Sequence, residues 1–258
     1  MQAPSQEPTK VKTSYDRGQD IDTVVADAII TDGRRWTFGS STPEHFADHI
    51  NRSIPLYLEG HQIVCGLSDY FMGEKGLCYE LGSSVGDLTA KLADRHASLK
   101  GARFVGLDEK AGMVEQSVER FANLPNLQFV RADVLDYSFE RCDLAVSYYT
   151  LQFIEIEARR RLVKRLYDNL KQGGALVVFE KTNCEAGAPQ DMMANLYVDF
   201  KIQNGFSAKE ILAKTASLKG VLNPLTSAEN HEMLKAAGFR NVFTISKFLQ
   251  FEGYVAVK

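Results

Sequence analysis

Acidic and aromatic side chains stand where four strand-like segments of this sequence end. Glu80 lies near the end of the first segment, in "YELGSSVGDLT", and Asp108 ends the second, in "GLDEK". Asp133 follows the third segment, in "RADVLD", and Tyr148-Tyr149 ends the fourth. In sheets built from alternating strands and helices, ligands bind beyond the carboxyl ends of the strands. We therefore predict that these side chains line one ligand site.

The turn after the first segment is bracketed by Gly82 and Gly86. Glycine lets the backbone approach a ligand closely, and the helix that follows offers free N–H groups at its start. The spacing does not meet the G-x-G-x-x-G pattern of dinucleotide loops, because position 84 is a serine. The carboxylate of Glu80 would also repel a phosphate, so a cationic ligand suits this loop better.

The two aspartates have a side chain suited to a nucleoside. Asp108 stands where an acid accepts hydrogen bonds from ribose hydroxyls in nucleoside-binding α/β folds, and Asp133 can accept one from an adenine amine. Each could instead be a helix cap or a turn residue. Acids at three successive strand ends, without a basic residue to hold a pyrophosphate, favour the nucleoside interpretation.

Strand-like and helix-like patterns alternate after residue 76. Helical periods are predicted over 85–96, 110–121 and 155–170, the last closed by Gly173-Gly174 as a helix stop. Two strand-like runs after about residue 239 predict an antiparallel hairpin. The pattern predicts an α/β fold with a doubly wound, mostly parallel, seven-stranded sheet. The five earlier strands are expected over 77–81, 103–107, 127–130, 144–148 and 175–179.

Further segments are expected around this sheet domain, which spans 77–258. Residues 1–20 are polar and are expected to form a flexible tail. An N-terminal helical cap is expected over 21–76, with its helical pattern at 42–67. A helical insertion is expected over about 189–237, ahead of the hairpin.

Composition narrows the class of protein. The 258 residues are 45% hydrophobic and 24% charged, with a formal net charge of −3, which gives no general attraction to nucleic acid or anionic membranes. The densest basic run, Arg159-Arg160-Arg161, is expected to be a solvated helix face. No apolar stretch approaches a membrane span, and no side chains show metal-site spacing. We expect a soluble cytoplasmic protein with no metal.

The segments "ELGSSVG", "GLDEK" and "RADVLD" resemble the motifs of the class I S-adenosylmethionine-dependent methyltransferases. The resemblance implies S-adenosyl-L-methionine as cofactor and a small molecule as substrate. The sulfonium of this cofactor is a compact cation, which aromatic faces stabilise by about 0.5–2 kcal/mol each. We therefore expect Tyr148, Tyr149 and Phe153 to lie at the reacting sulfonium, with Tyr197 and Phe200 as further candidates. The alternative for Tyr149 and Phe153 is an ordinary place in the core.

A second resemblance covers nearly the whole chain from Trp36 onward. The segments "NRSIPLY", "YTLQF", "GGALVVFEK" and "DFKIQNGFS" resemble the carboxy-S-adenosylmethionine synthases, which use prephenate to place a carboxylate on the sulfonium methyl. This resemblance implies a homodimer. The cofactor contacts that it implies are Tyr57, Gly82, Asp108, Glu109, Asp133 and Val134.

Two positions depart from that family. Thr215, in Lys214-Thr215-Ala216, stands where the family has an arginine that grips the transferred carboxylate. Tyr148 stands where the family has an asparagine. Loss of a bidentate arginine removes the contact that distinguishes a carboxylated cofactor from the ordinary one. Lys214 could swing in to replace it.

Three reactions therefore remain open. Methyl transfer to a small molecule is favoured because it is the common activity of the superfamily. The synthesis of a carboxylated cofactor is favoured by the resemblance and weakened by Thr215. The third reaction is cyclisation of S-adenosylmethionine to azetidine-2-carboxylate and methylthioadenosine, for which an aromatic cage and no carboxylate donor would suffice. A regulatory module that binds the cofactor without turnover is the non-enzymatic alternative.

Overall fold

The computed structural model describes residues 31–32, 35–36 and 43–258. The expected flexible tail over 1–20 lies outside the described residues, as does most of the segment that precedes position 43. The first described elements are two short antiparallel strands, β1 (Thr31–Asp32) and β2 (Arg35–Trp36).

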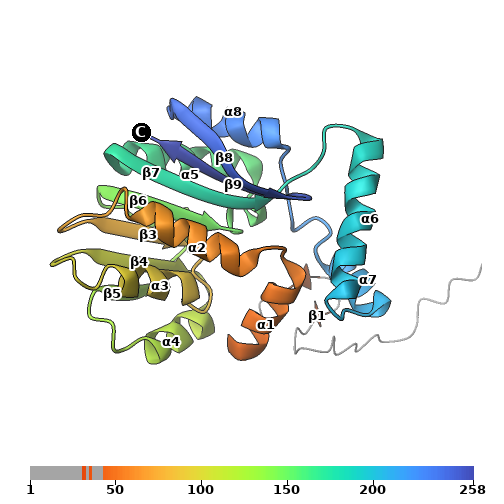
Figure 1. Cartoon of the computed structure of the whole chain (residues 1–258), viewed down its shortest axis with the longest axis horizontal. Coiled ribbons are helices and arrows are strands. Elements are labelled where there is room, and N and C mark those ends of the chain that lie inside the picture. Colours follow the sequence, from red (N-terminus) through yellow and green to blue (C-terminus); the bar gives the residue numbers. More distant parts are fainter. Residues whose placement is uncertain (1–30, 33–34, 37–42) are drawn as a thin grey trace, which may run out of the picture.

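A seven-stranded sheet forms the centre of the molecule, in the order β5-β4-β3-β6-β7-β9-β8 (Figure 1). The first five strands of this order run parallel, and β9 is antiparallel to both of its neighbours. This arrangement confirms the predicted doubly wound α/β fold with a C-terminal hairpin. The strands are β3 (Leu77–Leu81), β4 (Arg103–Asp108), β5 (Leu127–Arg131), β6 (Cys142–Tyr148), β7 (Leu170–Lys181), β8 (Asn241–Phe248) and β9 (Phe251–Val257).

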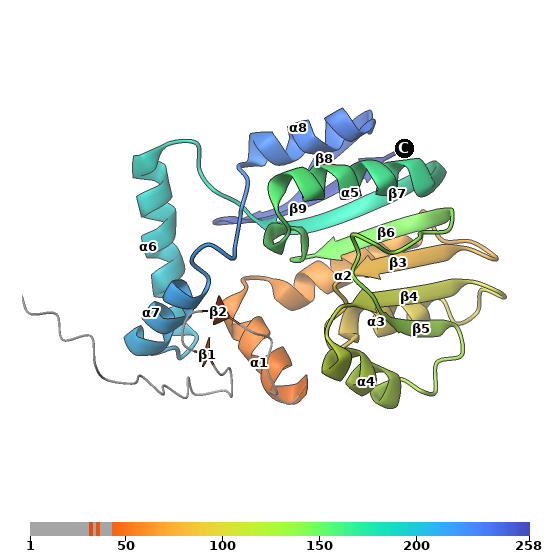
Figure 2. The same ribbon diagram turned by 180° about the vertical axis from the view of Figure 1, so that it is seen from behind.

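Helices cover both faces of the sheet, so its central strands are buried on both sides. Every residue of β3 is buried, as the apolar run "LCYEL" requires of a central parallel strand. One apolar cluster joins the sheet to α2 (Tyr57–Ser68) and α3 (Asp87–Arg95). The other joins it to α5 (Ile156–Asn169) and α8 (Ser227–Ala237) on the opposite face (Figure 2). The helix α4 (Ala111–Arg120) packs beside β4 and β5.

Three helices of the expected cap and insertion, α1 (Pro43–Ser53), α6 (Gly187–Gln203) and α7 (Ala208–Ser217), lie at one end of the sheet, whereas α2 and α8 cover its faces (Figures 1 and 2). The pattern over 42–67 forms two helices, α1 and α2, which are separated by a short segment in which Leu56 has a φ of 55°. The insertion contains α6 and α7. Both views place α1, α6 and α7 on the side toward which the parallel strands run (Figures 1 and 2). The last part of the segment 189–237 is α8, which packs against α5 in the helical layer.

The predicted glycine helix stop is wrong. The helix α5 ends at Asn169, and Gly173-Gly174 lie inside the strand β7. Leu170 already pairs with Cys142 of β6, and a bulge between Cys142 and Leu144 precedes the regular ladder. Strand pairing therefore ends the helix earlier than the local sequence indicates.

The basic run on α5 is only partly a solvated face. Arg160 and Arg161 are exposed, but Arg159 is fully buried. Its guanidinium donates to the carbonyl oxygens of Ile154 at 2.9 Å and Asn223 at 2.7 Å. Arg159 thus ties the segment after β6 to the segment before α8. Among the described residues, no helix has the length and apolar content needed to cross a membrane.

We expect Gly174→Ala to destabilise the fold by about 1–3 kcal/mol, because close packing does not accommodate an added methyl group. A Cβ at this position would lie 2.7 Å from the backbone oxygen of Asp143. Urea unfolding of the variant and the wild type measures the difference. The matched control is Gly66→Ala in α2, where nothing lies within 4 Å of the added Cβ. This control should be neutral or stabilising, and equal stability of both variants would contradict the assigned packing.

Candidate active site

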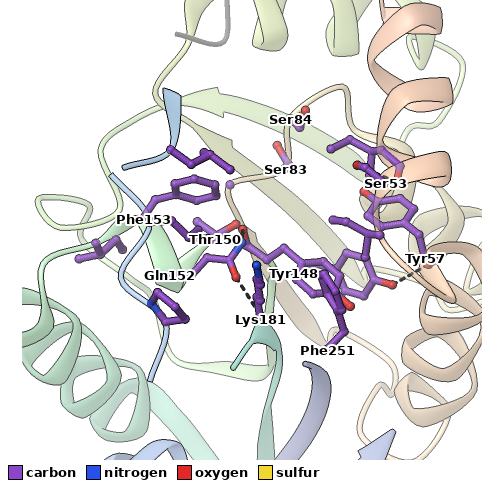
Figure 3. Close-up of a pocket in the computed structure, with 18 of the residues that line it drawn as sticks. Ser53, Tyr57, Ser83, Ser84, Tyr148, Thr150, Gln152, Phe153, Lys181 and Phe251 are labelled. Carbon is purple, nitrogen blue, oxygen red and sulfur yellow. Dashed lines mark hydrogen bonds between the residues drawn. The ribbon is translucent and has the colours of Figure 1, made fainter. Parts of the chain in front are cut away.

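A cavity of about 1180 Å³ opens beyond the carboxyl ends of β3, β4 and β6. Its volume slightly exceeds the range of about 300–1,000 Å³ that is typical of ligand pockets. Figure 3 shows the tyrosines of α2 and β6, the serines after β3 and Lys181 of β7 around the same space. Of the residues predicted from the sequence, the lining includes Tyr57, Glu80, Gly82, Asp108, Glu109, Asp133, Val134, Tyr148, Tyr149 and Phe153.

Two predicted residues lie outside this lining. Gly86 precedes α3 with a φ of 81°, and a Cβ there would lie 2.5 Å from the ring of Phe129. Its lack of a side chain therefore serves the packing of the turn against β5. Phe200 packs against Tyr197 and Phe248, with ring centroids 6.4 Å and 6.2 Å away.

The loop after β3 is locked to the loop after β6. Gly82 has a φ of 69°, and a Cβ there would lie 2.3 Å from the hydroxyl oxygen of Thr150. That hydroxyl donates to the carbonyl oxygen of Leu81 at 2.8 Å. Only glycine fits both the backbone conformation and this contact. The two loops therefore form one wall of the cavity.

Asp108 organises the same loop. Its carboxylate accepts from the backbone N–H of Ser84 at 2.8 Å and of Lys110 at 2.9 Å. Ser84 itself has a φ of 51°, a conformation that few side chains adopt without compensation. Burial raises the pKa of Asp108, and the two backbone hydrogen bonds oppose that shift. Each carboxylate oxygen still has a lone pair for a ligand hydroxyl.

The other acids differ in environment. Asp133 accepts from the backbone N–H of Leu135 at 2.8 Å, so it acts as a turn residue while lining the cavity. Glu80 is 3% exposed and accepts a hydrogen bond from Thr89. Burial raises the pKa of Glu80 to about 8. At neutral pH this side chain is therefore mostly protonated, which removes much of the negative charge expected for the loop.

Three tyrosine rings form an aromatic wall, which we define as Tyr57, Tyr148 and Tyr149. The ring centroids of Tyr148 lie 5.1 Å from Tyr57 and 4.9 Å from Tyr149. The Tyr148 hydroxyl donates to the carbonyl oxygen of Tyr57 at 2.6 Å (Figure 3). A Cβ at Gly60 would lie 2.0 Å from that hydroxyl, so α2 needs a glycine there to receive the tyrosine.

The backbone at Tyr149 is strained. Its φ is 60°, and its N–H donates to the carbonyl oxygen of Phe179 at 2.8 Å. Positive φ at a bulky side chain costs of order 1–3 kcal/mol and persists where the surroundings hold it. Tyr148 and Tyr149 are 6% and 8% exposed, so they belong to the core and to the cavity wall together. Burial raises the pKa of both phenols, which therefore stay protonated.

The sequence analysis named Lys214 but missed two further lysines of the site, Lys181 and Lys201. Lys181 ends β7, Lys201 lies on α6 and Lys214 lies on α7, and all line the cavity. The ammonium nitrogens of Lys181 and Lys201 lie 4.8 Å and 4.3 Å from the centroid of the Tyr197 ring. Burial lowers the pKa of Lys201 to about 8 and that of Lys214 to about 7, helped by repulsion from neighbouring lysines. Lys181 stands at a strand end, a signal that the sequence offered.

Position 215 has no cation. The hydroxyl of Thr215 donates to the carbonyl oxygen of Ile211 in its own helix at 2.8 Å. Next to it, the ammonium of Lys214 lies 2.5 Å from His49 Nε2 and 3.4 Å from the hydroxyl of Ser53. Burial and the nearby cations lower the pKa of His49 to about 3, so its ring is neutral and accepts from Lys214. Among the described residues, no cluster of His, Cys, Asp and Glu is arranged to hold a metal ion.

Comparisons with known proteins define the class. A model described as a methyltransferase domain matches residues 79–174. A putative O-methyltransferase from Nostoc punctiforme has a similar structure, with a TM-score of 0.60 and 17% identity over 83% of this chain and 59% of that one. The structure of PigF with SAH gives a TM-score of 0.51 at 17% identity, over 70% of this chain and 50% of that one. These structures support the fold. The protein is an enzyme of the class I S-adenosylmethionine-dependent methyltransferase superfamily.

Sequence relatives narrow this class. A carboxy-S-adenosyl-L-methionine synthase of Staphylococcus epidermidis is 36% identical over 87% of this chain and 97% of its own length. A protein of the same name from Yersinia enterocolitica is 32% identical over 86% of this chain and 85% of its own length. The chain therefore belongs to the carboxy-S-adenosyl-L-methionine synthase family, and S-adenosyl-L-methionine is its cofactor.

The cavity suits this cofactor chemically. It offers carboxylates to a nucleoside at Asp108 and Asp133, and neutral aromatic rings to a sulfonium at Tyr148 and Tyr149. We propose that Asp108 takes the ribose, that Asp133 takes the adenine, and that the aromatic wall takes the sulfonium, with Glu109, Val134 and Phe153 completing the lining.

We expect Asp108→Ala to weaken S-adenosylhomocysteine binding by about 1.5–3 kcal/mol, the range for hydrogen bonds to charged groups. Isothermal titration calorimetry measures the affinity. The control is Asp168→Ala on α5, because Asp168 is exposed and pairs with Lys164 on the surface. An unchanged affinity in the Asp108 variant would show that the carboxylate only organises the loop.

Proposed function

We propose that this enzyme converts S-adenosylmethionine itself, by closing the methionine chain into a ring. The α-amine attacks the γ-carbon, a C–N bond forms, and the bond between that carbon and sulfur breaks. Its electron pair stays on sulfur, and the α-ammonium gives up one proton. The products are azetidine-2-carboxylate and methylthioadenosine, and no second substrate is consumed.

The observation that supports this proposal most strongly is Thr215. Thr215 stands where the resembled family has the arginine that grips the transferred carboxylate. The hydroxyl of Thr215 donates to a backbone carbonyl of its own helix. An enzyme without that arginine lacks the planar fork that binds a carboxylate in a bidentate way. The relatives are named for a reaction at the cofactor rather than at a separate acceptor. Cyclisation is a reaction at the cofactor that needs no carboxylate donor.

The aromatic wall supplies the positioning. In the substrate the sulfur carries a positive charge, which the faces of Tyr148 and Tyr149 stabilise. A ring closure needs the amine held close behind the γ-carbon, and such positioning can lower a barrier by several kcal/mol. The Tyr148 hydroxyl stays protonated and donates a hydrogen bond to the Tyr57 carbonyl. We therefore expect it to orient the tyrosine ring rather than to transfer a proton.

Lys214 is the group suited to receive the proton. Burial first, and then Lys201 and Lys181, lower its pKa to about 7. A lysine whose pKa is lowered in this way is uncharged above that pH, and its nitrogen can then accept a proton. Its hydrogen bond to His49 keeps the nitrogen at the cavity. The proposed cyclisation should therefore speed up as the pH rises through about 7.

Synthesis of a carboxylated cofactor is the second candidate, and the lysines favour it. Lys214 is adjacent to Thr215, and Lys181 and Lys201 add two further cations to the cavity. Ammonium groups bind carboxylates as point charges without the geometry of an arginine. Methyl transfer to an acceptor is the activity common in the superfamily, and the same experiment distinguishes it.

Mass spectrometry of the purified enzyme with S-adenosylmethionine tests the proposal. We expect methylthioadenosine and azetidine-2-carboxylate to form without any partner, faster than in a protein-free control. Carboxy-S-adenosylmethionine formed only with prephenate would establish the second candidate instead. S-adenosylhomocysteine formed only with an added acceptor would establish methyl transfer.

Thr215→Arg should increase the affinity for carboxy-S-adenosylmethionine relative to S-adenosylmethionine. A strong preference of the wild type for the carboxylated form would contradict cyclisation.

Substitution of Tyr148 tests the aromatic wall. Tyr148→Phe keeps the ring face and loses one hydrogen bond, so we expect a loss of about 0.5–1.5 kcal/mol in stability and most of the turnover to remain. Tyr148→Asn removes the ring and about 0.5–2 kcal/mol of cation stabilisation. For cyclisation this second loss should fall mainly on kcat, and for simple methyl transfer mainly on cofactor binding. Equal kinetics of the two variants, both near the wild type, would place Tyr148 in the core alone.

A further inference from the structure

Two lysines, the half-buried Lys181 and the buried Lys201, converge on one tyrosine ring in the cavity. Lys181 comes from the end of β7, and Lys201 comes from the same helix as Tyr197. Their ammonium nitrogens lie 4.8 Å and 4.3 Å from the centroid of that ring. Lys201 is only 7% exposed. We call Lys181, Lys201 and Tyr197 the lysine–tyrosine group.

These cations have no acidic partner in the described part of the chain. Within residues 43–258, the ion pairs involve other lysines and arginines, and neither Lys181 nor Lys201 lies within 4.0 Å of a carboxylate oxygen. A buried cation without a partner is costly, and two of them repel each other. The pKa shifts show this cost: burial lowers the pKa of Lys181, and burial and then Lys181 lower that of Lys201. A bound anion would offset the cost of holding two positive charges in this place, and groups with shifted pKa values in a cavity are typical of functional sites.

The charged residues of the cavity lining are distributed unevenly. The acids Asp87, Asp108, Glu109 and Asp133 belong to the side of β3, β4 and β5, where Lys91 and Lys110 also lie. The lysines at positions 181, 201 and 214 belong to β7, α6 and α7, which contribute no acid to the lining. The aromatic wall lies on α2 and β6, the strand between β3 and β7 in the sheet. The order across the site is therefore acidic, aromatic and basic. A ligand that matches it carries a nucleoside, a cation and an anion in that sequence.

The surroundings of the basic end favour a carboxylate on a short carbon chain. The ring of Tyr197 packs against Phe251 at 5.1 Å between centroids, and both rings line the cavity. Apolar rings beside the ammonium groups suit a singly charged group on an apolar chain better than a doubly charged, strongly hydrated phosphate. Gln152 accepts from the backbone N–H of Lys181 at 2.8 Å, which fixes the end of β7 and the root of that side chain (Figure 3).

We propose that the lysine–tyrosine group is a carboxylate-binding site. Lys181 and Lys201 hold the carboxylate, and Tyr197 keeps the two ammonium groups in place when the site is empty. The inference rests on the proposed function in one respect, that the ligand is S-adenosylmethionine or a substrate bound beside it. The carboxylate has two sources: the methionine carboxylate of the cofactor, or the carboxylate of a separate acid. In the first case the site holds the end of the chain that closes into the ring.

Equilibrium binding separates these sources without turnover. Calorimetry of the full-length wild type, Lys181→Met and Lys201→Met is carried out with S-adenosylhomocysteine and with methylthioadenosine, which lacks the amino-acid part. We expect each variant to bind S-adenosylhomocysteine about tenfold more weakly, as loss of one charged contact implies. Binding of methylthioadenosine should stay unchanged, which also shows that the variants fold. Decarboxylated S-adenosylmethionine should likewise bind all proteins alike, because it keeps the amine and sulfonium and lacks only the carboxylate.

Two further variants sharpen the test. Lys201→Arg keeps the charge and should retain most of the affinity for S-adenosylhomocysteine. Lys209→Met removes an exposed lysine of α7 that does not line the cavity, and it should bind every ligand like the wild type. If the variants at 181 and 201 lose only the binding of prephenate in the presence of S-adenosylhomocysteine, the carboxylate belongs to a second acid. Unchanged binding of S-adenosylhomocysteine and of prephenate in both variants would overturn the site, whatever product mass spectrometry finds.

Discussion

The parallel pairing of β3 between β4 and β6 is the constraint on which the site depends. It brings the loops after these strands to one edge, where Thr150 closes on Gly82 and bonds the carbonyl oxygen of Leu81. Asp108 then accepts from Ser84 in the same loop. A change in register of a single residue would turn the side chains of the shifted strand to the other face of the sheet and would displace the loop that follows it. The cavity therefore depends first on strand pairing, which places the loops that form its wall.

The charged side chains differ between the two ends of that cavity. Acids gather beyond β3, β4 and β5, tyrosine rings lie beside them, and lysines gather at β7, α6 and α7. Burial weakens the charge at both ends, because it raises the pKa of Glu80 to about 8 and lowers that of Lys214 to about 7. Groups with shifted pKa values in a cavity are typical of sites that move protons or bind charged ligands. This is the physical basis for proposing a reaction within one zwitterionic, sulfonium-bearing molecule.

Local patterns failed where tertiary pairing competed with them. Gly173-Gly174 has the composition of a helix stop, yet the pairing of Leu170 with Cys142 starts β7 earlier. Arg159 belongs to a basic run typical of a solvated face, yet its guanidinium is buried against two carbonyl oxygens. Phe200 was a further candidate for the sulfonium site, and it packs against Phe248 outside the cavity lining. In each case a decisive partner (Cys142 for Leu170, Asn223 for Arg159, Phe248 for Phe200) lies far along the chain, where periodicity carries no information.

By itself, the sequence determined the order of strands and helices, the doubly wound sheet, the family and the strand-end residues that line the cavity. It could do so because apolar periodicity and the carboxyl-end rule are local and geometric. Only the tertiary structure decided that the Tyr148 hydroxyl donates a hydrogen bond to the Tyr57 carbonyl in the space beside Gly60. It alone also decided that lysines from β7, α6 and α7 share one end of the cavity. Those contacts join segments separated by tens of residues, and burial, which sets their pKa values, exists only once the chain has folded.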